Sequence, residues 1–395
     1  MDRIVVTGIG VISAIGNNVA ENRHALINRN CGMGKLEMFP SRFSGILPVG
    51  EIKISNESLQ EKLQVHEPGV TRTSLLALHA LQEALQESRL TPAEIAAYDT
   101  ALISANTVGG MCLTDEMYHD SKKETGSSEY ISSYDYGSIN RFLQSRFHFS
   151  GPINTINTAC SSSANAIMYG ARLIKSGRVK RAIVGGTDSL AKFTINGFNS
   201  LRILSNEICT PFDEGRKGLN LGEGAAFLVL EKESEASPKK IYAALSGYAN
   251  ANDAFHASSL SDDAAGPYKV MKEALEVAGL SPADIGFINA HGTGTENNDL
   301  VESIAMKKLF SEIPPFASTK ANTGHTLGAA AAIEAVYAIL NLSEQEIYPA
   351  INFNVPITAT GLIPADSYRK AELEHVMSNS FGFGGNCSSL IFSRA

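Results

Sequence analysis

Short apolar runs alternate along the chain with apolar residues at helical spacing. Residues 4–10, I-V-V-T-G-I-G, form a continuous apolar run that ends in a glycine turn, which is typical of a buried strand. Leucines at 75, 78, 81 and 85 recur at helical spacing and predict an amphipathic helix. Apolar runs near 101–105 and 287–290 predict further strands. The alternation of buried strands and helices favours mostly parallel sheets covered by helices on both faces.

One phrase of the sequence occurs twice, 190 residues apart. Residues 80–95 read A-L-Q-E-A-L-Q-E-S-R-L-T-P-A-E-I, and residues 270–285 read V-M-K-E-A-L-E-V-A-G-L-S-P-A-D-I. A Ser/Thr-Pro-x-acid helix start is common, but the order around it also repeats. Each half continues with a strand, a polar turn and a helix rich in small residues, at 153–176 and 316–341.

This repetition of order indicates a duplicated α/β unit. We therefore expect an N-terminal half over residues 1–235 and a C-terminal half over residues 236–395. The charged segment 232–240, which contains Ser-Pro, would connect the two halves.

Cys160 lies where a predicted strand passes into a predicted helix. The residues from 153 to 156 suit an extended run, the apolar residues from 164 to 174 have helical spacing, and Gly177 supplies a stop. Free N–H groups and the positive end of the helix dipole would face the sulfur and favour the nucleophilic thiolate. A buried cysteine is more often a small hydrophobic residue, but this context favours a nucleophile.

Two histidines of the second half stand in similar surroundings. His291, in N-A-H-G-T-G-T, ends a predicted strand, and the helix that follows carries Asp299 and Glu302. His325 follows Lys320 in S-T-K-A-N-T-G-H, before an alanine-rich helix. One histidine at a strand end is usually a structural residue, whereas two are harder to explain in that way. Their spacing matches no zinc motif, so we expect no zinc site.

The residues from 379 to 385, N-S-F-G-F-G-G, form a glycine-rich loop between two predicted strands. The pattern suits a structural hairpin. Its small residues would equally let backbone N–H groups approach a ligand closely.

Composition narrows the classes of function. Apolar residues make up 44% of the chain and charged residues 19%, which is typical of a soluble globular enzyme. A net charge of −8 and a pI near 5.7 argue against nucleic acid and against anionic membrane surfaces as partners. The five cysteines lie far apart without metal-ligand spacing, so we expect reduced thiols and a cytoplasmic location. The start of the chain predicts no signal peptide, and we expect no membrane-spanning run of 18 apolar residues.

In this order, these motifs resemble those of the elongating, type II β-ketoacyl-acyl-carrier-protein synthases. The resemblance covers the whole chain and is carried by T-A-C-S-S-S, P-F-D-x-x-R, G-E-G-A, N-A-H-G-T-G-T, S-T-K-x-x-T-G-H-x-L-G-A-A and N-S-F-G-F-G-G. It implies a thiolase-like fold, in which two duplicated α/β halves form a five-layer α-β-α-β-α sandwich. It also implies a homodimer.

The resemblance assigns catalytic roles residue by residue. Cys160 matches the acyl-accepting nucleophile, and His291 and His325 match the pair that handles malonyl decarboxylation. Lys320 matches a lysine that pairs with an acid, and Glu302 matches that acid.

The same comparison implies the surroundings of these groups. The backbone N–H groups of Cys160 and Phe383 match the oxyanion hole, and Phe383 matches a gate residue. Val108 and Phe381 match positions of the acyl pocket. A structural Na⁺ or K⁺ site of some family members corresponds to Asn289, Glu334, Ser378 and Asn379.

The implied reaction is a decarboxylative Claisen condensation in fatty-acid chain elongation, which requires no cofactor. An acyl group on Cys160 would react with malonyl-acyl-carrier protein to give 3-oxoacyl-acyl-carrier protein. Such chemistry calls for a thiolate, two aimed N–H donors and ping-pong kinetics. Two neutral imidazoles would hold the enolate charge, and burial would keep them neutral.

Three departures from the family pattern leave the pathway open. Asn386-Cys387 replaces the usual Thr-Asn, the loop 206–210 is short, and Val108 is smaller than the isoleucine often found there. A ketosynthase of a specialised polyene or polyketide pathway is therefore an alternative, and so is a partnership with a paralogue instead of a homodimer.

Two other classes fit less well. A thiolase would place a second cysteine in a C-terminal C-x-G motif, and a chain-length partner subunit would lack the nucleophile. For the acidic carrier protein, Arg202 and Lys192 are candidate contacts near the pocket mouth.

Overall fold

Each half of the chain contributes five strands to the main sheet, and these follow the same spatial order in both halves. The computed structural model describes residues 2–123, 128 and 130–395. The N-terminal half has the order β5 (Ile153–Ile156), β4 (Thr100–Ala105), β6 (Arg181–Asp188), β7 (Gly224–Lys232) and β1 (Ile4–Ser13). The C-terminal half has the order β10 (Phe316–Ala317), β9 (Phe287–Asn289), β13 (His375–Phe381), β14 (Asn386–Ser393) and β8 (Ala243–Asn252).

Strand directions repeat as well, so the predicted duplication is confirmed. In each half the first two pairings of this order are parallel and the last two are antiparallel. The expectation of mostly parallel sheets was therefore wrong. Strands that helices cover on both faces read as continuous apolar runs, and such runs carry no information about direction.

A short contact joins the two sets of strands into one ten-stranded sheet. β1 pairs with β8 through Val5 and Val6, which lie opposite Ala244 and Ala243. The predicted limit at residue 235 falls in the connection between β7 and β8, which contains the 3₁₀ turn Glu233–Glu235. Two small antiparallel pairs lie apart from the main sheet, β2 (Met33–Gly34) with β3 (Val49–Gly50) and β11 (Glu346–Ile347) with β12 (Arg369–Lys370).

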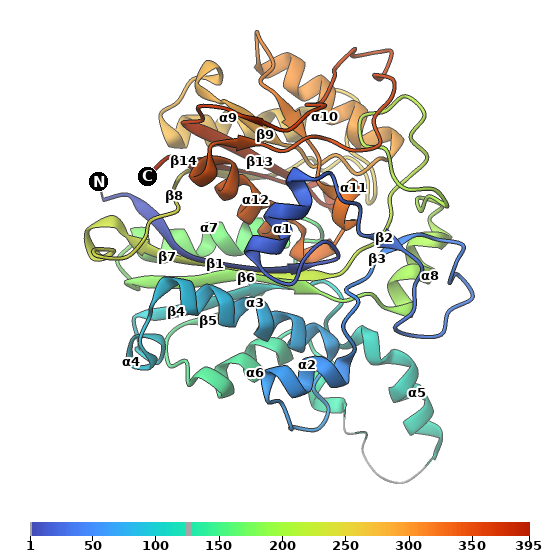
Figure 1. The fold of residues 1–395 in the computed structure, drawn as a ribbon, viewed down its shortest axis with the longest axis vertical. Coiled ribbons are helices and arrows are strands. Elements are labelled where there is room, and N and C mark those ends of the chain that lie inside the picture. Colours follow the sequence, from blue (N-terminus) through green and yellow to red (C-terminus); the bar gives the residue numbers. More distant parts are fainter. Residues whose placement is uncertain (1, 124–127, 129) are drawn as a thin grey trace.

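Helices and strands form five layers, as the family resemblance implied (Figure 1). One outer layer contains α2 (Asn56–Leu63), α3 (Arg72–Ser88) and α6 (Ser138–Phe147). The central layer contains α7 (Ser162–Lys175) and α12 (Ala330–Glu344), and the other outer layer contains α9 (Ala265–Ala278) and α10 (Glu296–Leu309). The remaining helices are α1 (Val19–Ile27), α4 (Pro92–Ile95), α5 (Thr114–Lys123), α8 (Lys192–Ser200) and α11 (Lys320–Thr323).

The repeated phrase of the sequence performs the same task in both halves. Thr91 and Glu94 form a reciprocal capping box at the start of α4. Ser281 and Asp284 form the equivalent box at the 3₁₀ turn Pro282–Asp284. Each box satisfies backbone N–H groups in the connection between an outer helix and the buried strand that follows it.

The stretch Leu327–Glu344 is the exception to the expectation that no segment could span a membrane. With 18 residues and a mean hydropathy of 1.2, it is long and apolar enough to cross a membrane, by length and composition only. However, 89% of this stretch is buried inside the protein, between the two sets of strands. It is thus apolar because it forms the central layer of the core.

Gly10 marks the closest approach of α3 to β1, and its replacement tests this packing. An added Cβ would lie 2.1 Å from the carbonyl oxygen of Ala80 and 2.7 Å from the backbone nitrogen of Ala84. We expect Gly10→Ala to lower the free energy of unfolding by about 1–3 kcal/mol, because the helix must move off the sheet.

Gly34→Ala is the control, since no heavy atom lies within 4 Å of its added Cβ. Chemical denaturation of both variants measures the difference. Equal free energies of unfolding would contradict the close packing.

Candidate active site

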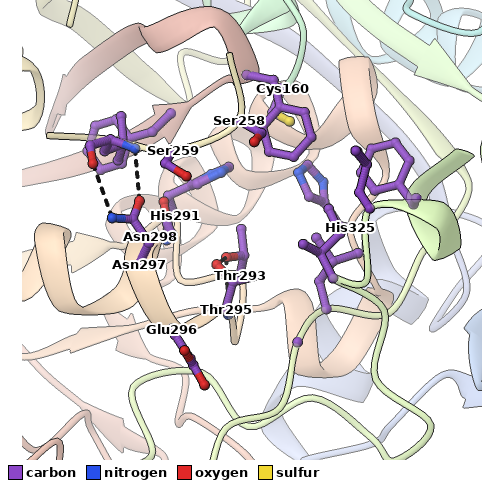
Figure 2. A pocket seen from close by; sticks show the side chains of 18 of the residues that line it. Cys160, Ser258, Ser259, His291, Thr293, Thr295, Glu296, Asn297, Asn298 and His325 are labelled. Atoms are coloured by element: carbon purple, nitrogen blue, oxygen red, sulfur yellow. Dashed lines mark hydrogen bonds between the residues drawn. The ribbon is translucent and has the colours of Figure 1, made fainter. Parts of the chain in front are cut away.

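Three reactive side chains meet between the two halves (Figure 2). Cys160 follows β5, His291 follows β9, and His325 lies between α11 and α12. The Cys160 sulfur and one ring nitrogen of each histidine lie within 4.8 Å of one another, and all three side chains are buried. The structure therefore brings together the three reactive residues that the sequence singled out.

A tight turn presents Cys160 just before α7. Ala159 has a left-handed backbone with φ of 54°, an uncommon conformation for a residue other than glycine. The Ser162 hydroxyl accepts a 2.8 Å hydrogen bond from the Thr158 backbone N–H and so closes the turn.

The resting thiol is less acidic than the sequence suggested. Burial raises the pKa of the Cys160 thiol to about 11, against the charge of Lys320 and the backbone N–H groups of Phe383 and Cys160. The expectation of a stabilised thiolate was therefore wrong for this state. The predicted donors are present, but the cost of burying a charge outweighs them.

Both imidazoles are neutral, as expected from their burial. Burial and the positive charge of Lys320 hold the pKa values of His291 and His325 well below the usual value. The Leu327 backbone N–H donates to His325 Nδ1 at 3.2 Å, which leaves the ring proton on Nε2. Lys320 Nζ lies 3.2 Å from His291 Nδ1, which favours the same tautomer there.

Lys320 pairs with a different acid from the one expected. Its ammonium group donates to Glu334 on α12 and, at 2.6 Å, to the His291 backbone carbonyl. The expected pairing with Glu302 was wrong. Glu302 instead accepts 2.9 Å hydrogen bonds from the backbone N–H groups of His291 and Gly292, and so holds the histidine's loop. Both acids are buried, Glu302 on α10 and Glu334 on α12, and the sequence does not show which of them reaches Lys320.

The glycine-rich loop lies directly against the Cys160 turn. The backbone N–H of Phe383 forms a hydrogen bond with the Cys160 thiol. An added Cβ at Gly382 would lie 3.1 Å from the Cys160 nitrogen, so the approach requires a glycine. The Phe383 ring stacks on Phe198 at 5.8 Å, and the Phe381 ring lies 5.7 Å from the His291 ring.

A cavity of about 440 Å³ opens onto these groups. Thr293 and Thr295 follow along its wall from His291 toward Glu296 (Figure 2). Val108 is not among the described residues that line it. It is buried in an apolar cluster with Leu327, against which Phe198 packs. Phe198, whose ring stacks on Phe383, both lines the cavity and packs against this cluster, and Leu219 of the cluster also lines the cavity.

Asn386, one of the departures from the family pattern, binds three side chains at the base of the glycine-rich loop. Its side-chain oxygen accepts hydrogen bonds from Ser161 Oγ at 2.6 Å, Asn165 Nδ2 at 2.9 Å and Asn250 Nδ2 at 2.8 Å. It therefore ties the base of the loop to the residue beside the nucleophile. Cys387 is buried, and the pKa of its thiol is raised by burial.

Two buried carboxylates were missed as site residues. Asp299, expected only as a helix residue, accepts hydrogen bonds from the backbone N–H groups of Phe212, Thr293 and Gly294. Asp188, at the end of β6, accepts from Thr107, Val108 and Gly328. An acidic residue directly after an apolar run was the available signal for Asp188.

The expected cation site has two unsatisfied oxygens. Asn289 Oδ1 and Glu334 Oε2 are buried and lack hydrogen-bond partners within the described part of the chain. Oxygen ligands of this kind suit a monovalent cation. Ser378 is buried nearby on β13, whereas the Asn379 side chain is engaged with Glu302 and Ser389.

Two family models match this chain. The model "Beta-ketoacyl synthase, N-terminal domain" matches residues 1–236, and "Beta-ketoacyl synthase, C-terminal domain" matches residues 242–354. The 3-oxoacyl-[acyl-carrier-protein] synthase 2 of Coxiella burnetii is 31% identical, covering 99% of this chain and 98% of the relative.

Two solved structures are similar over all of this chain. The ishigamide ketosynthase/chain length factor superimposes with a TM-score of 0.93 at 27% identity, with 99% of that chain covered. The ketosynthase ApeO in complex with its chain length factor ApeC, from Xenorhabdus doucetiae, superimposes with a TM-score of 0.89 at 33% identity, with 98% covered.

Replacing Lys320 by methionine tests its electrostatic effect on the nucleophile. The lysine charge lowers the pKa of the Cys160 thiol, so its loss raises that pKa and reduces the thiolate fraction at a given pH. We expect iodoacetamide to alkylate Cys160 roughly tenfold more slowly, since only the thiolate reacts. Peptide mass analysis follows the modification.

Two further variants make this result interpretable. Lys320→Met with Glu334→Gln removes both charges of the buried pair and guards against unfolding around an unpaired carboxylate. Lys308→Met is the control, because Lys308 is exposed and its ammonium binds the Asp263 carbonyl. Glu334 itself raises the pKa of the Cys160 thiol, so its loss offsets part of the effect in the double variant. A wild-type alkylation rate in the folded Lys320→Met variant would contradict the proposed charge effect.

Proposed function

Because the chain belongs to the β-ketoacyl synthase family, we propose that it condenses an acyl group with malonyl-acyl-carrier protein in fatty-acid chain elongation. The observation that carries this proposal is the convergence of one thiol and two neutral imidazoles in a single cavity. A thiol accepts the acyl group, and neutral N–H donors suit an enolate.

The first half-reaction loads the enzyme. The Cys160 sulfur attacks the thioester carbonyl, and the carbonyl oxygen points at the backbone N–H groups of Cys160 and Phe383. The carrier's thiolate leaves and takes up the proton that the Cys160 thiol gives off. The high pKa of the resting thiol means that this proton has to move as the carbon–sulfur bond forms.

The second half-reaction forms the carbon–carbon bond. Malonyl-carrier loses CO₂, and the electrons of the broken bond become an enolate on its thioester. Nε2–H of His325, and the equivalent N–H of His291, hold that oxyanion without protonating the carbon. The enolate carbon attacks the acyl group on Cys160 and releases the Cys160 thiolate, which regains a proton from solvent. The product is a 3-oxoacyl-carrier that is two carbons longer.

A ketosynthase of a polyene or polyketide pathway is the second candidate. Its support is the close superposition on chains of the ishigamide ketosynthase/chain length factor and of the complex between the ketosynthase ApeO and its chain length factor ApeC. Because this chain has Cys160, it would be the condensing subunit in such a pair, not the chain length factor.

We propose a homodimer, with a paralogous partner as the alternative. β5 ends the sheet, and no described strand pairs with its outer side. An open edge of this kind accepts a strand from another chain. We also propose a cytoplasmic location, from the free thiols of all five cysteines.

A structural Na⁺ or K⁺ would be held by the unsatisfied oxygens of Asn289 and Glu334, with Ser378 nearby. The ion would neutralise the Glu334 oxygen that Lys320 leaves free. It would take no part in bond making.

The carrier protein would dock at the cavity mouth, through its acidic helix. Arg202 is exposed there and lines the cavity, so it is the better candidate contact. Lys192 already forms a 2.6 Å ion pair with Asp115, which reduces its attraction for another acid.

Intact-mass analysis separates the two half-reactions. With acyl-carrier alone, we expect Cys160 to gain the mass of the acyl group, and malonyl-carrier to discharge it as the elongated 3-oxoacyl-carrier. His325→Ala should still load but should lose about 10²–10³ in the discharge rate, because one enolate donor is gone. His119→Ala, an exposed histidine of α5, is the control. Absence of loading from every acyl-carrier tested would overturn the nucleophile assignment.

Reversing the charge of Arg202 tests carrier docking. We expect Arg202→Glu to raise the KM for acyl-carrier roughly tenfold, while loading from small acyl thioesters continues at the wild-type rate. Lys192→Glu should have a smaller effect, because Asp115 already pairs with that lysine. If Arg202→Glu slows small and carrier-bound substrates equally, the residue does not act through docking.

A further inference from the structure

Asp188 joins two segments that serve different parts of the reaction. It ends β6 and is fully buried. Oδ1 accepts a 2.8 Å hydrogen bond from the Val108 backbone N–H. Oδ2 accepts from the Thr107 hydroxyl at 2.6 Å and from the Gly328 backbone N–H at 2.7 Å. One carboxylate thus binds a loop of the N-terminal half and a turn of the C-terminal half.

The turn on the C-terminal side carries His325. Gly328 follows Leu327, whose backbone N–H donates to His325 Nδ1 and determines which nitrogen carries the ring proton. The contact is tight, because an added Cβ at Gly328 would lie 2.8 Å from Asp188 Oδ2. A shift of Asp188 would therefore move this turn and with it the imidazole.

The loop on the N-terminal side carries Val108, which lies in one apolar cluster with the side chain of Leu327. This cluster packs against Phe198, whose ring stacks on Phe383, and the family resemblance places the acyl pocket at Val108. An acyl chain that fills this region would press on Val108 and Leu327. Both residues are held through the carboxylate of Asp188, directly or through the neighbouring Gly328.

We propose that Asp188 is a positioning residue that couples the acyl-chain region at Val108 to the imidazole of His325. The length of the bound acyl chain would thereby influence the decarboxylation centre. This inference rests on the proposed condensation and deepens it, because it names a residue through which chain length affects the second half-reaction.

Asp188→Asn tests the coupling with little change of shape. An amide keeps one acceptor oxygen and turns a donor toward either Val108 or Gly328, so it cannot hold both segments. The test loads Cys160 with butanoyl, octanoyl or dodecanoyl groups and measures discharge by malonyl-carrier in single turnovers. We expect the ratio of discharge rates between the best and the worst acyl group to shrink roughly fivefold, within the range of measured couplings through packed networks. The KM for malonyl-carrier should stay unchanged.

Asp213→Asn is the matched control. Asp213 is also buried and accepts three backbone hydrogen bonds, from Gly215, Asn354 and Val355, but none of these belongs to the site. It should lower thermal stability like Asp188→Asn while it preserves the chain-length ratio. If Asp188→Asn does not fold, Thr107→Val removes only the 2.6 Å hydroxyl contact and should shrink the ratio less.

The outcomes separate this inference from the proposed function. A wild-type protein that never loads or discharges any chain overturns the condensation itself. The coupling alone is overturned if the wild-type protein discriminates between acyl groups and a folded Asp188→Asn variant does so equally. Equal discrimination means a ratio of discharge rates within about twofold of the wild-type ratio.

Discussion

The buried ammonium group of Lys320 is the constraint on which the rest of the site depends. A cation at this depth requires a neutralising partner, and Glu334 of α12 supplies it. The same charge lowers the pKa values of both histidines and opposes the rise of the Cys160 pKa. One residue therefore influences the protonation of all three reacting groups. Glu302 supports the His291 loop separately, so charge and position are controlled by different carboxylates.

The duplication explains why these groups meet. Cys160 lies between β5 and α7, and His325 lies between β10 and α12, which are equivalent elements of the two halves. The central helices thus begin at the same site, one after the nucleophile and the other after a histidine. β4 and β9 are equivalent too, so Val108 and His291 also follow matching strands. One half supplies the thiol and Val108, and the other supplies both histidines.

Features with a local signature could be predicted from the sequence, and features that depend on depth or distance could not. The capping boxes at Thr91 and Ser281 revealed the duplication because their residues touch within one turn. The partner of Lys320 was misassigned because the resemblance matched Glu302 to it, and the sequence does not show that Glu334 of the central helix α12 lies within reach. The acidity expected of Cys160 was misjudged because a helix start is visible in sequence, whereas complete burial is not. Asp188 was missed because its three partners come from two distant segments.

Separate contacts hold the loop over Cys160 at its base and at its crest. Asn386 gathers three donors there, and a threonine hydroxyl, with its shorter reach, would not span the same set. At the crest the Phe383 ring stacks on Phe198, and the Gly384 backbone N–H donates to the Ala257 carbonyl at 2.8 Å. The Gly384 carbonyl accepts from Asn252 Nδ2 at 3.0 Å. Gly384 and Gly385 have positive φ values of 79° and 78°. Glycine tolerates such angles and large changes from them. A rotation within Gly382–Gly385 would therefore have to break the hydrogen bonds of Gly384, whereas the contacts of Asn386 keep Ser161, and with it Cys160, in place.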